Sequence, residues 1–114
     1  MNTFGQAVRE LRRSKGVSQR DLAAKVGVDF SYISKLENDR MPPPSADTIV
    51  RICEALDESP DVLLASIGKM PSQLRETVSR SPAAQRFIRQ AHEMGITDKE
   101  WGELTDHLRQ LRRG

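Results

Sequence analysis

Short stripes of apolar residues recur along this chain at helical spacing, and most of them lie between a residue that caps helices and one that ends them. The first stripe has the spacing i, i+3, i+4 and i+7 and consists of Phe4, Ala7, Val8 and Leu11. That spacing is typical of one buried helix face, and this helix ends near Gly16. Alternating strand-type runs and the Asn-Gly hairpin signal are absent from the sequence. The pattern predicts an all-α fold.

Four further helices are predicted before residue 69. Ser18 and Ser45 are of the type that caps helix N-termini, and Ser59-Pro60 adds a proline suited to the first helical position. Gly27 lies between the second and third helices, where a positive φ is needed. The predicted helices cover residues 19–26, about 29–38, and the segments that follow Ser45 and Ser59. The apolar residues carried by these helices are Leu22, Ala23, Val26, Ile33, Leu36, Ile49, Ile52, Cys53, Leu56, Val62, Leu63 and Ile67, with Ile33 and Leu36 turned inward.

The segment Met41-Pro42-Pro43-Pro44 interrupts this helical pattern. Each proline lacks a backbone N–H and restricts the residue before it, so the segment cannot continue a helix. We expect a stiff connector between the third and fourth helices.

Residues 69–114 are predicted to form a helical C-terminal extension, separate from a first domain over residues 1–68. Ser81-Pro82 repeats the cap-plus-proline signal, and Thr97 with Glu100 forms a possible capping box. The last helix carries a narrow seam of Trp101, Leu104, Leu108 and Leu111. The spacing of three, four and three residues is heptad-like and favours dimerisation. The alternative is that this seam packs on the fifth helix or on the Phe87-Ile88 stripe of the same chain.

Charge is segregated along the chain, although its total is only +2, from 18 basic and 16 acidic residues. Residues 1–40 hold eight basic and five acidic side chains, and residues 41–68 hold one basic and five acidic. The total is too near neutrality to indicate a polyanion partner by itself. Residues 69–114 hold nine basic and six acidic side chains, so the distribution of charge is more informative than its total.

The helices predicted over 18–26 and 29–38, with Gly27 between them, fit a DNA-binding helix-turn-helix. Ala23 is small where the two helices would cross, and Ile33 and Leu36 would anchor the second helix. The residues left to face a groove are Phe30, Ser31, Ser34 and Lys35. The full pattern reads Ser18-Gln19-x-x-Leu22-Ala23-x-x-Val26-Gly27-Val28-x-x-x-x-Ile33-Ser34-x-Leu36-Glu37-Asn38. It closely resembles the Cro and phage-repressor type (xenobiotic response element, XRE) helix-turn-helix family over residues 4–68.

The resemblance implies a five-helix, lambda-repressor-like bundle whose third helix inserts into the major groove of double-stranded DNA. By position in the motif, Gln19 would bind the DNA backbone and brace the recognition helix. The positions that would contact base edges are Phe30, Ser31 and Lys35, and those that would grip phosphate are Asn38 and Arg40. The resemblance also suggests a pairing of Arg12 with Glu37.

Phe30 departs from the polar residue common at its position in the family. A phenyl ring cannot form bidentate hydrogen bonds with adenine or guanine. We therefore expect it to contact thymine methyl groups, with Tyr32 assisting at the DNA backbone.

Other functional classes find little support in the sequence. The single cysteine, Cys53, cannot form an intrachain disulfide and lies on an apolar stripe. Neither a secretory signal nor a run of roughly 20 apolar residues is present, so we expect a cytoplasmic protein without a membrane partner. His92 and His107 lie on different predicted helices, and no zinc, Walker or nucleophile-elbow spacing occurs. We expect no enzymatic activity, cofactor or metal.

The expected function is a sequence-specific transcriptional regulator, in particular a repressor, that binds a palindromic operator as a homodimer. Two alternatives remain open at this point. The protein could be an antitoxin or interaction module whose C-terminal helices bind a partner protein. It could also be a repressor inactivated by a partner metallopeptidase.

Overall fold

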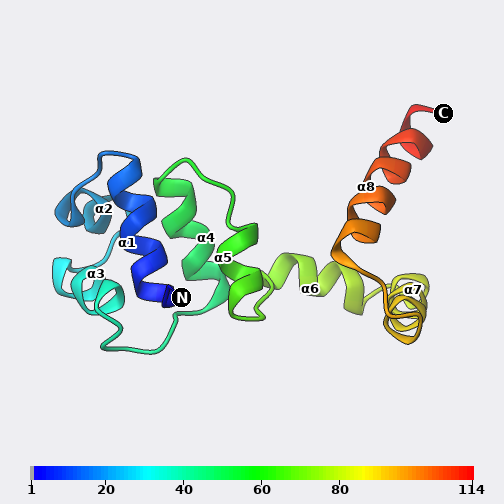
Figure 1. The fold of residues 1–114 in the computed structure, drawn as a ribbon, viewed down its shortest axis with the longest axis horizontal. Coiled ribbons are helices and arrows are strands. Elements are labelled where there is room, and N and C mark those ends of the chain that lie inside the picture. Colours follow the sequence, from blue (N-terminus) through cyan, green and yellow to red (C-terminus); the bar gives the residue numbers. More distant parts are fainter. Residues whose placement is uncertain (1) are drawn as a thin grey trace. The chain divides into compact units, whose positions relative to one another are not determined.

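The structure, a computed structural model, describes residues 2–114, and every regular element among them is an α-helix. The helices, labelled in Figure 1, are α1 (Phe4–Ser14), α2 (Gln19–Val26), α3 (Phe30–Glu37), α4 (Ala46–Ala55), α5 (Asp61–Ser66), α6 (Ser72–Ser79), α7 (Pro82–Glu93) and α8 (Asp98–Arg113). The chain divides into two compact units, the first ending at Arg75 and the second comprising Glu76–Gly114. The predicted all-α class is confirmed, and the first unit extends seven residues past the expected boundary at 68.

Side-chain caps explain where the helices begin. Ser18 and Ser45 accept hydrogen bonds from backbone N–H groups three residues later, as predicted. Thr3 caps α1 in the same way, with Gln6 returning a bond to complete a capping box that the sequence analysis had not identified. Gly27 ends α2 with φ +85°, a left-handed conformation that glycine adopts without strain. Each of these caps satisfies a backbone group that the helix end leaves unpaired.

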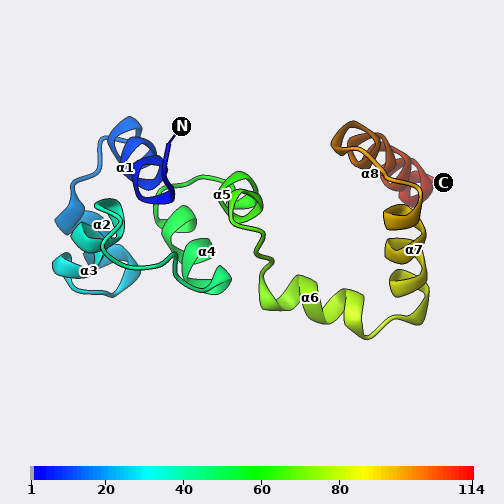
Figure 2. The same cartoon turned by 60° about the horizontal axis from the view of Figure 1, so that its bottom comes forward.

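The core of the first unit lies where α1, α2, α3 and α4 meet. Figure 2 shows α2 and α3 side by side, and both pack against neighbouring helices. The buried residues of this core are Val8, Leu22, Ala23, Val26, Ile33, Leu36, Ile52 and Leu56. A second cluster of Ala46, Ile49, Cys53 and Leu64 joins α4 to α5. The apolar stripes of the first four helices are therefore confirmed as core.

Helix α5 differs from its prediction in register. Asp61 is its first helical residue, so Pro60 occupies the N-cap position rather than the first turn. Val62, one of the apolar residues predicted on this helix, is 81% exposed, and Leu64, which the sequence analysis did not single out, is buried. Leu64 packs in the cluster that joins α5 to α4, and the predicted Leu63 and Ile67 are partly buried against the same cluster.

Hydrogen bonds attach Lys69, before α6, to the proline connector, and Ser72, the first residue of α6, to α4. Proline carbonyl oxygens still accept hydrogen bonds, and Lys69 Nζ donates to those of Pro43 (3.3 Å) and Pro44 (2.6 Å). Asp47 accepts from the backbone N–H (3.2 Å) and the hydroxyl (2.7 Å) of Ser72. These bonds explain why the first unit continues into α6.

The sequence analysis did not predict α6. Its apolar pattern consists of little more than Leu74 and Val78, and none of its residues is buried. An isolated helix of eight residues has little stability of its own. Its existence therefore depends on contacts such as the Asp47–Ser72 bonds.

The second unit contains α7 and α8, which begin at the predicted caps Ser81 and Thr97. Thr97 and Glu100 form the predicted capping box. Only Ala91 is buried in this unit. The rings of Phe87 and Trp101 pack at 5.9 Å between centroids, which joins α7 to α8. Across residues 2–114, no helix is both long and apolar enough to pass through a bilayer.

Candidate nucleic-acid interface

Helix α3 has one face in the core and the other in solvent. Ile33 and Leu36 are fully or almost fully buried. Phe30, Ser31 and Lys35 are exposed on the outer face, with Phe30 at 43%. The three residues expected to contact base edges therefore share an open surface.

Ser34 and Tyr32 are less accessible than their neighbours on α3. Both are half-buried, and Tyr32 packs against the core cluster. Burial raises the pKa of the Tyr32 hydroxyl, and the positive charge of Arg51 opposes part of that rise. Tyr32 still borders an open hollow that Ser31, Lys35 and Arg40 also line. The Tyr32 side chain thus packs partly against the core and is partly exposed at the outer surface.

Glu37, the last residue of α3, is a buried carboxylate with three hydrogen bonds. Its oxygens accept from Arg12 Nε (2.6 Å), Arg12 Nη2 (2.9 Å) and Gln19 Nε2 (3.0 Å). Burial alone would raise the pKa of Glu37, but these hydrogen bonds and the charges of Arg12 and Arg9 hold it below its ordinary value. The predicted Arg12–Glu37 pair is confirmed, and Gln19 braces α3 through the same carboxylate.

Asn38, expected to grip phosphate, is exposed and forms two hydrogen bonds within the protein. Its Oδ1 accepts a hydrogen bond from Arg9 Nη2 (2.6 Å), and its Nδ2 donates to the carbonyl oxygen of Ser34 (2.8 Å). The side-chain amide thus links the end of α3 to Arg9 of α1. Arg40 remains exposed and lines the hollow beside Lys35.

The start of α1 contacts the end of α3 more closely than the sequence analysis suggested. Asp39, at φ +57°, accepts from Gly5 N–H (2.9 Å) and from the Thr3 hydroxyl (2.5 Å). A Cβ on Gly5 would lie only 2.4 Å from the Leu36 carbonyl oxygen. The one available signal was a glycine inside a predicted helix, which often marks a close backbone approach.

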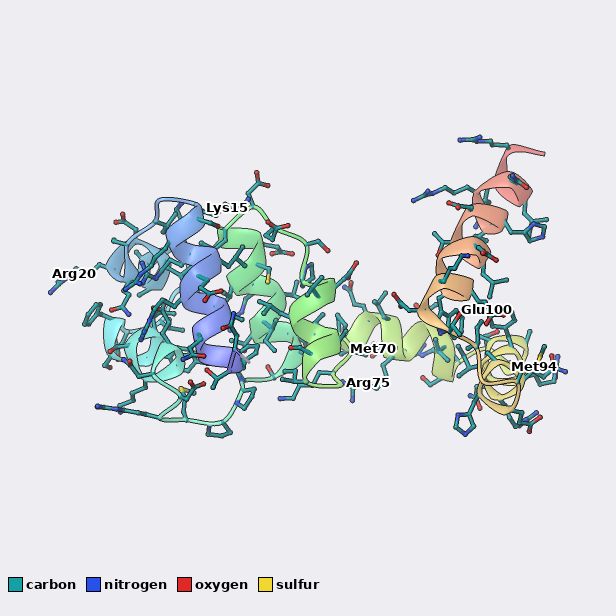
Figure 3. The ribbon with its side chains drawn as sticks, in the orientation of Figure 1. Lys15, Arg20, Met70, Arg75, Met94 and Glu100 are labelled. Carbon is teal, nitrogen blue, oxygen red and sulfur yellow. The ribbon has the colours of Figure 1, made fainter. Side chains whose placement is uncertain are left out.

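A second missed contact joins α2 to α3. The guanidinium carbon of Arg20 lies 5.1 Å from the centroid of the Phe30 ring. Arg20, labelled in Figure 3, is exposed at the start of α2. The surrounding hollow is lined by Arg9, Arg12, Arg13, Ser18, Gln19, Arg20 and Phe30. This surface is strongly basic and lies next to the outer face of α3.

The predicted seam of α8 divides into two parts. Trp101 and Leu104 are half-buried, and Trp101 packs on Phe87, as the intrachain alternative expected. Leu108 and Leu111 are 56% and 65% exposed. Leu108 and Leu111 help to line an apolar hollow of about 360 Å³ on the second unit. The end of the seam is therefore available to another chain.

The described residues offer binding chemistry more readily than catalysis. Between residues 2 and 114, no cluster of His, Cys, Asp or Glu is arranged to hold a metal ion. The outer surface of α2 and α3 instead combines cations, hydroxyls and one exposed ring. Those groups suit phosphate and base edges.

Comparisons with known proteins agree with this geometry. The helix-turn-helix family pattern matches residues 8–63. RghRB, an uncharacterized HTH-type transcriptional regulator of Bacillus subtilis, is 34% identical over 79 residues, which cover 67% of this chain. This chain spans only 57% of RghRB. SinR, an HTH-type transcriptional regulator of the same organism, is 28% identical over 110 residues, covering 91% of this chain and 90% of SinR.

Two solved structures of SinR extend the comparison. SinR in complex with DNA matches with a TM-score of 0.51 and 35% identity, over 54% of this chain and 98% of the SinR chain. A complex of SinR with SinI matches with a TM-score of 0.52 and 27% identity, over 98% of this chain and all of the matched chain. With the fold and the exposed face of α3, these matches show that the chain belongs to the Cro/repressor-type (XRE) helix-turn-helix family of DNA-binding transcriptional regulators.

Proposed function

We propose that this protein is a sequence-specific transcriptional repressor that binds a palindromic operator as a homodimer, with α3 in the major groove. The observation that carries the proposal is the division of α3 into two faces. Ile33 and Leu36 are buried, which leaves Phe30 and Lys35 exposed on the same helix. A helix held in this way can enter a groove without unfolding its support.

The exposed residues divide into two kinds of contact. Ser31 and Lys35 carry hydrogen-bond donors for base edges, and the Phe30 ring suits the thymine methyl group. Arg13, Arg20 and Arg40 are exposed cations placed around this face and suit phosphates, which contribute affinity without sequence information. Repression needs only that this binding occlude a promoter.

The second unit supports the dimer. Glu76–Gly114 is close to the roughly 40 residues below which a domain usually needs help from oligomerisation, and only Ala91 is buried in it. Exposed Leu108 and Leu111 can gain stability by packing against a second copy. Two copies related by a two-fold axis would read half-sites about one helical turn, roughly 34 Å, apart.

A partner protein is a second candidate for the surface of α8. It is favoured by the full-length match to SinR in its complex with SinI. In that case the exposed leucines of the second unit would bind a partner protein instead of a second copy of this chain.

The deciding experiment is selection of bound sequences from a random DNA pool, with the mass of the protein in solution measured in parallel. An enriched inverted repeat bound by a dimer supports the proposal. If roughly six phosphates are neutralised, log affinity should fall with log salt at a slope of about −5. A pool without enrichment, or a flat salt response, would contradict it.

A further inference from the structure

The Arg20–Phe30 contact joins the two helices of the helix-turn-helix on its outer side. Arg20 is the second residue of α2, Phe30 is the first of α3, and the guanidinium carbon is 5.1 Å from the ring centroid. At this distance a cation is attracted by the face of an aromatic ring. Because Phe30 is still 43% exposed, part of its ring remains open beside the guanidinium.

The charge of Arg20 is free for another partner. The neighbouring cations Arg9 and Arg12 are directed at the buried carboxylate of Glu37. Within residues 2–114, no carboxylate forms an ion pair with Arg20 or Arg13. A guanidinium that stacks by its face keeps its N–H groups in its own plane, where they can bind an anion.

We propose that Arg20 is a specificity-determining residue that acts through Phe30. Its guanidinium holds the phenyl ring against a thymine 5-methyl group and binds an adjacent backbone phosphate with its N–H groups. This inference rests on the proposed function, because it requires α3 to lie in the major groove.

The physical reason is that a phenyl ring has no hydrogen bond with which to orient itself on a base. Its preference for thymine comes only from contact with one methyl group, so the preference depends on where the ring is held. An exposed ring that can turn loses part of that contact. Stacking under Arg20 fixes the ring before DNA binds and reduces the ordering cost of the contact.

The test uses the full chain and the operator obtained by selection. Each thymine of one half-site is replaced in turn by deoxyuridine, which removes only the 5-methyl group. Affinities are measured for the wild type and for Arg20→Gln, Arg13→Gln, Phe30→Ala and the Arg20→Gln/Phe30→Ala double variant. Arg13→Gln is the matched control, because Arg13 lines the same hollow and loses the same charge without touching the ring in the structure. Thermal unfolding confirms that every variant is folded.

We expect one deoxyuridine position to weaken wild-type binding about fourfold, the effect of losing contact with one carbon. Arg13→Gln keeps this fourfold effect, Phe30→Ala abolishes it, and Arg20→Gln reduces it to less than twofold. Arg20→Gln and Arg13→Gln each reduce the magnitude of the salt slope by about 0.9, because each removes one phosphate contact. The double variant, like Phe30→Ala, shows no deoxyuridine effect.

Two outcomes overturn the inference. If Arg20→Gln keeps the full fourfold deoxyuridine effect, Arg20 contacts only the backbone. If Arg20→Gln leaves the salt slope unchanged, Arg20 does not bind phosphate. Failure of the proposed function is a separate result, because then the wild-type protein would select no sequence at all.

Discussion

Arg12 and Glu37 form a buried ion pair with two contacts, in which Arg12 Nε lies 2.6 Å from Glu37 Oε2 and Arg12 Nη2 lies 2.9 Å from Oε1. Arg12 also donates from Nη1 to the carbonyl oxygen of Val17 (2.8 Å). The pair connects α1 to the last residue of α3, and the Val17 bond connects it to the turn before α2. Arg12 thus helps to position α3 relative to both α1 and α2.

Arg12→Ala should lower the free energy of unfolding of the first unit by about 3–5 kcal/mol, because it leaves the Glu37 carboxylate buried without its main partner. Urea denaturation at neutral pH, followed by circular dichroism, measures the change. Lys15→Ala is the control, because the Lys15–Glu58 pair is partly exposed at 3.3 Å and such pairs contribute about 0–1 kcal/mol. Equal effects of the two substitutions would show that the buried pair does not hold the unit together.

The pH dependence of stability should show the lowered pKa of Glu37. A carboxylate whose pKa is lower in the folded state stabilises the protein at pH values above its pKa in the unfolded chain, about 4.5 for glutamate. That stability is lost as the pH falls through the folded-state pKa. Thermal unfolding from pH 7 down to pH 2.5 should therefore show a decline that begins near pH 4.5. Asp47, whose pKa is lowered by its hydrogen bonds with Ser72, contributes with the same sign.

Glu37→Gln separates the two groups. This variant should be less stable at neutral pH and should show a shallower decline in acid, whereas Asp47→Asn should keep most of the wild-type decline. A Glu37→Gln profile parallel to that of the wild type would assign the acid sensitivity to other carboxylates.

Gly5→Ala should destabilise the first unit by about 1–3 kcal/mol, because the added Cβ would lie 2.4 Å from the Leu36 carbonyl oxygen and 2.8 Å from that of Glu37. Both contacts are with backbone atoms, so α1 would have to move away from α3. Gly102→Ala is the matched control, since nothing lies within 4 Å of its Cβ position on α8. Alanine there should be neutral or stabilising by up to about 1 kcal/mol. Chemical denaturation of both variants gives the comparison.

Lys35→Ala should lower affinity for the selected operator by about 1–3 kcal/mol and relax the preference at one base position. Arg40→Ala should instead weaken specific and random duplexes alike and make the salt slope less steep by about 0.9. Fluorescence anisotropy at several salt concentrations distinguishes the two effects. Equal losses on both duplexes for Lys35→Ala would remove it from base recognition.

Leu108→Ser should shift the protein from dimer to monomer, because it removes an exposed apolar side chain from the proposed dimer surface. Val62→Ser is a suitable control, since Val62 is more exposed than Leu108 but lies in the first unit. Sedimentation equilibrium over a range of concentrations gives the dissociation constants. A dimer that is unaffected by Leu108→Ser but disrupted by a change at Trp101 or Phe87 would move the interface to the aromatic end of α8.

Local patterns in the sequence were enough to predict most of the helices. The caps at Ser18, Ser45 and Thr97 act within a few residues of chain, so residue type and spacing specify them. The apolar stripe of α3 was also a local property, and it correctly assigned Ile33 and Leu36 to the core. Helix α6 was missed because nothing in its own residues requires it.

The arrangement of the outer surface depended on contacts between residues distant in sequence. The Arg12–Glu37 pair was suggested only by family resemblance, and the Arg9–Asn38 and Asp39–Gly5 bonds were not suggested at all. The Arg20–Phe30 contact spans the turn between two helices, and its geometry depends on their crossing. Short-range patterning determined which segments of this chain are helical and which faces are apolar. Only the packing of α1 and α2 on α3 decided which polar side chains bond within the protein and which remain exposed. That choice depends on distances between helices, which no single helix contains.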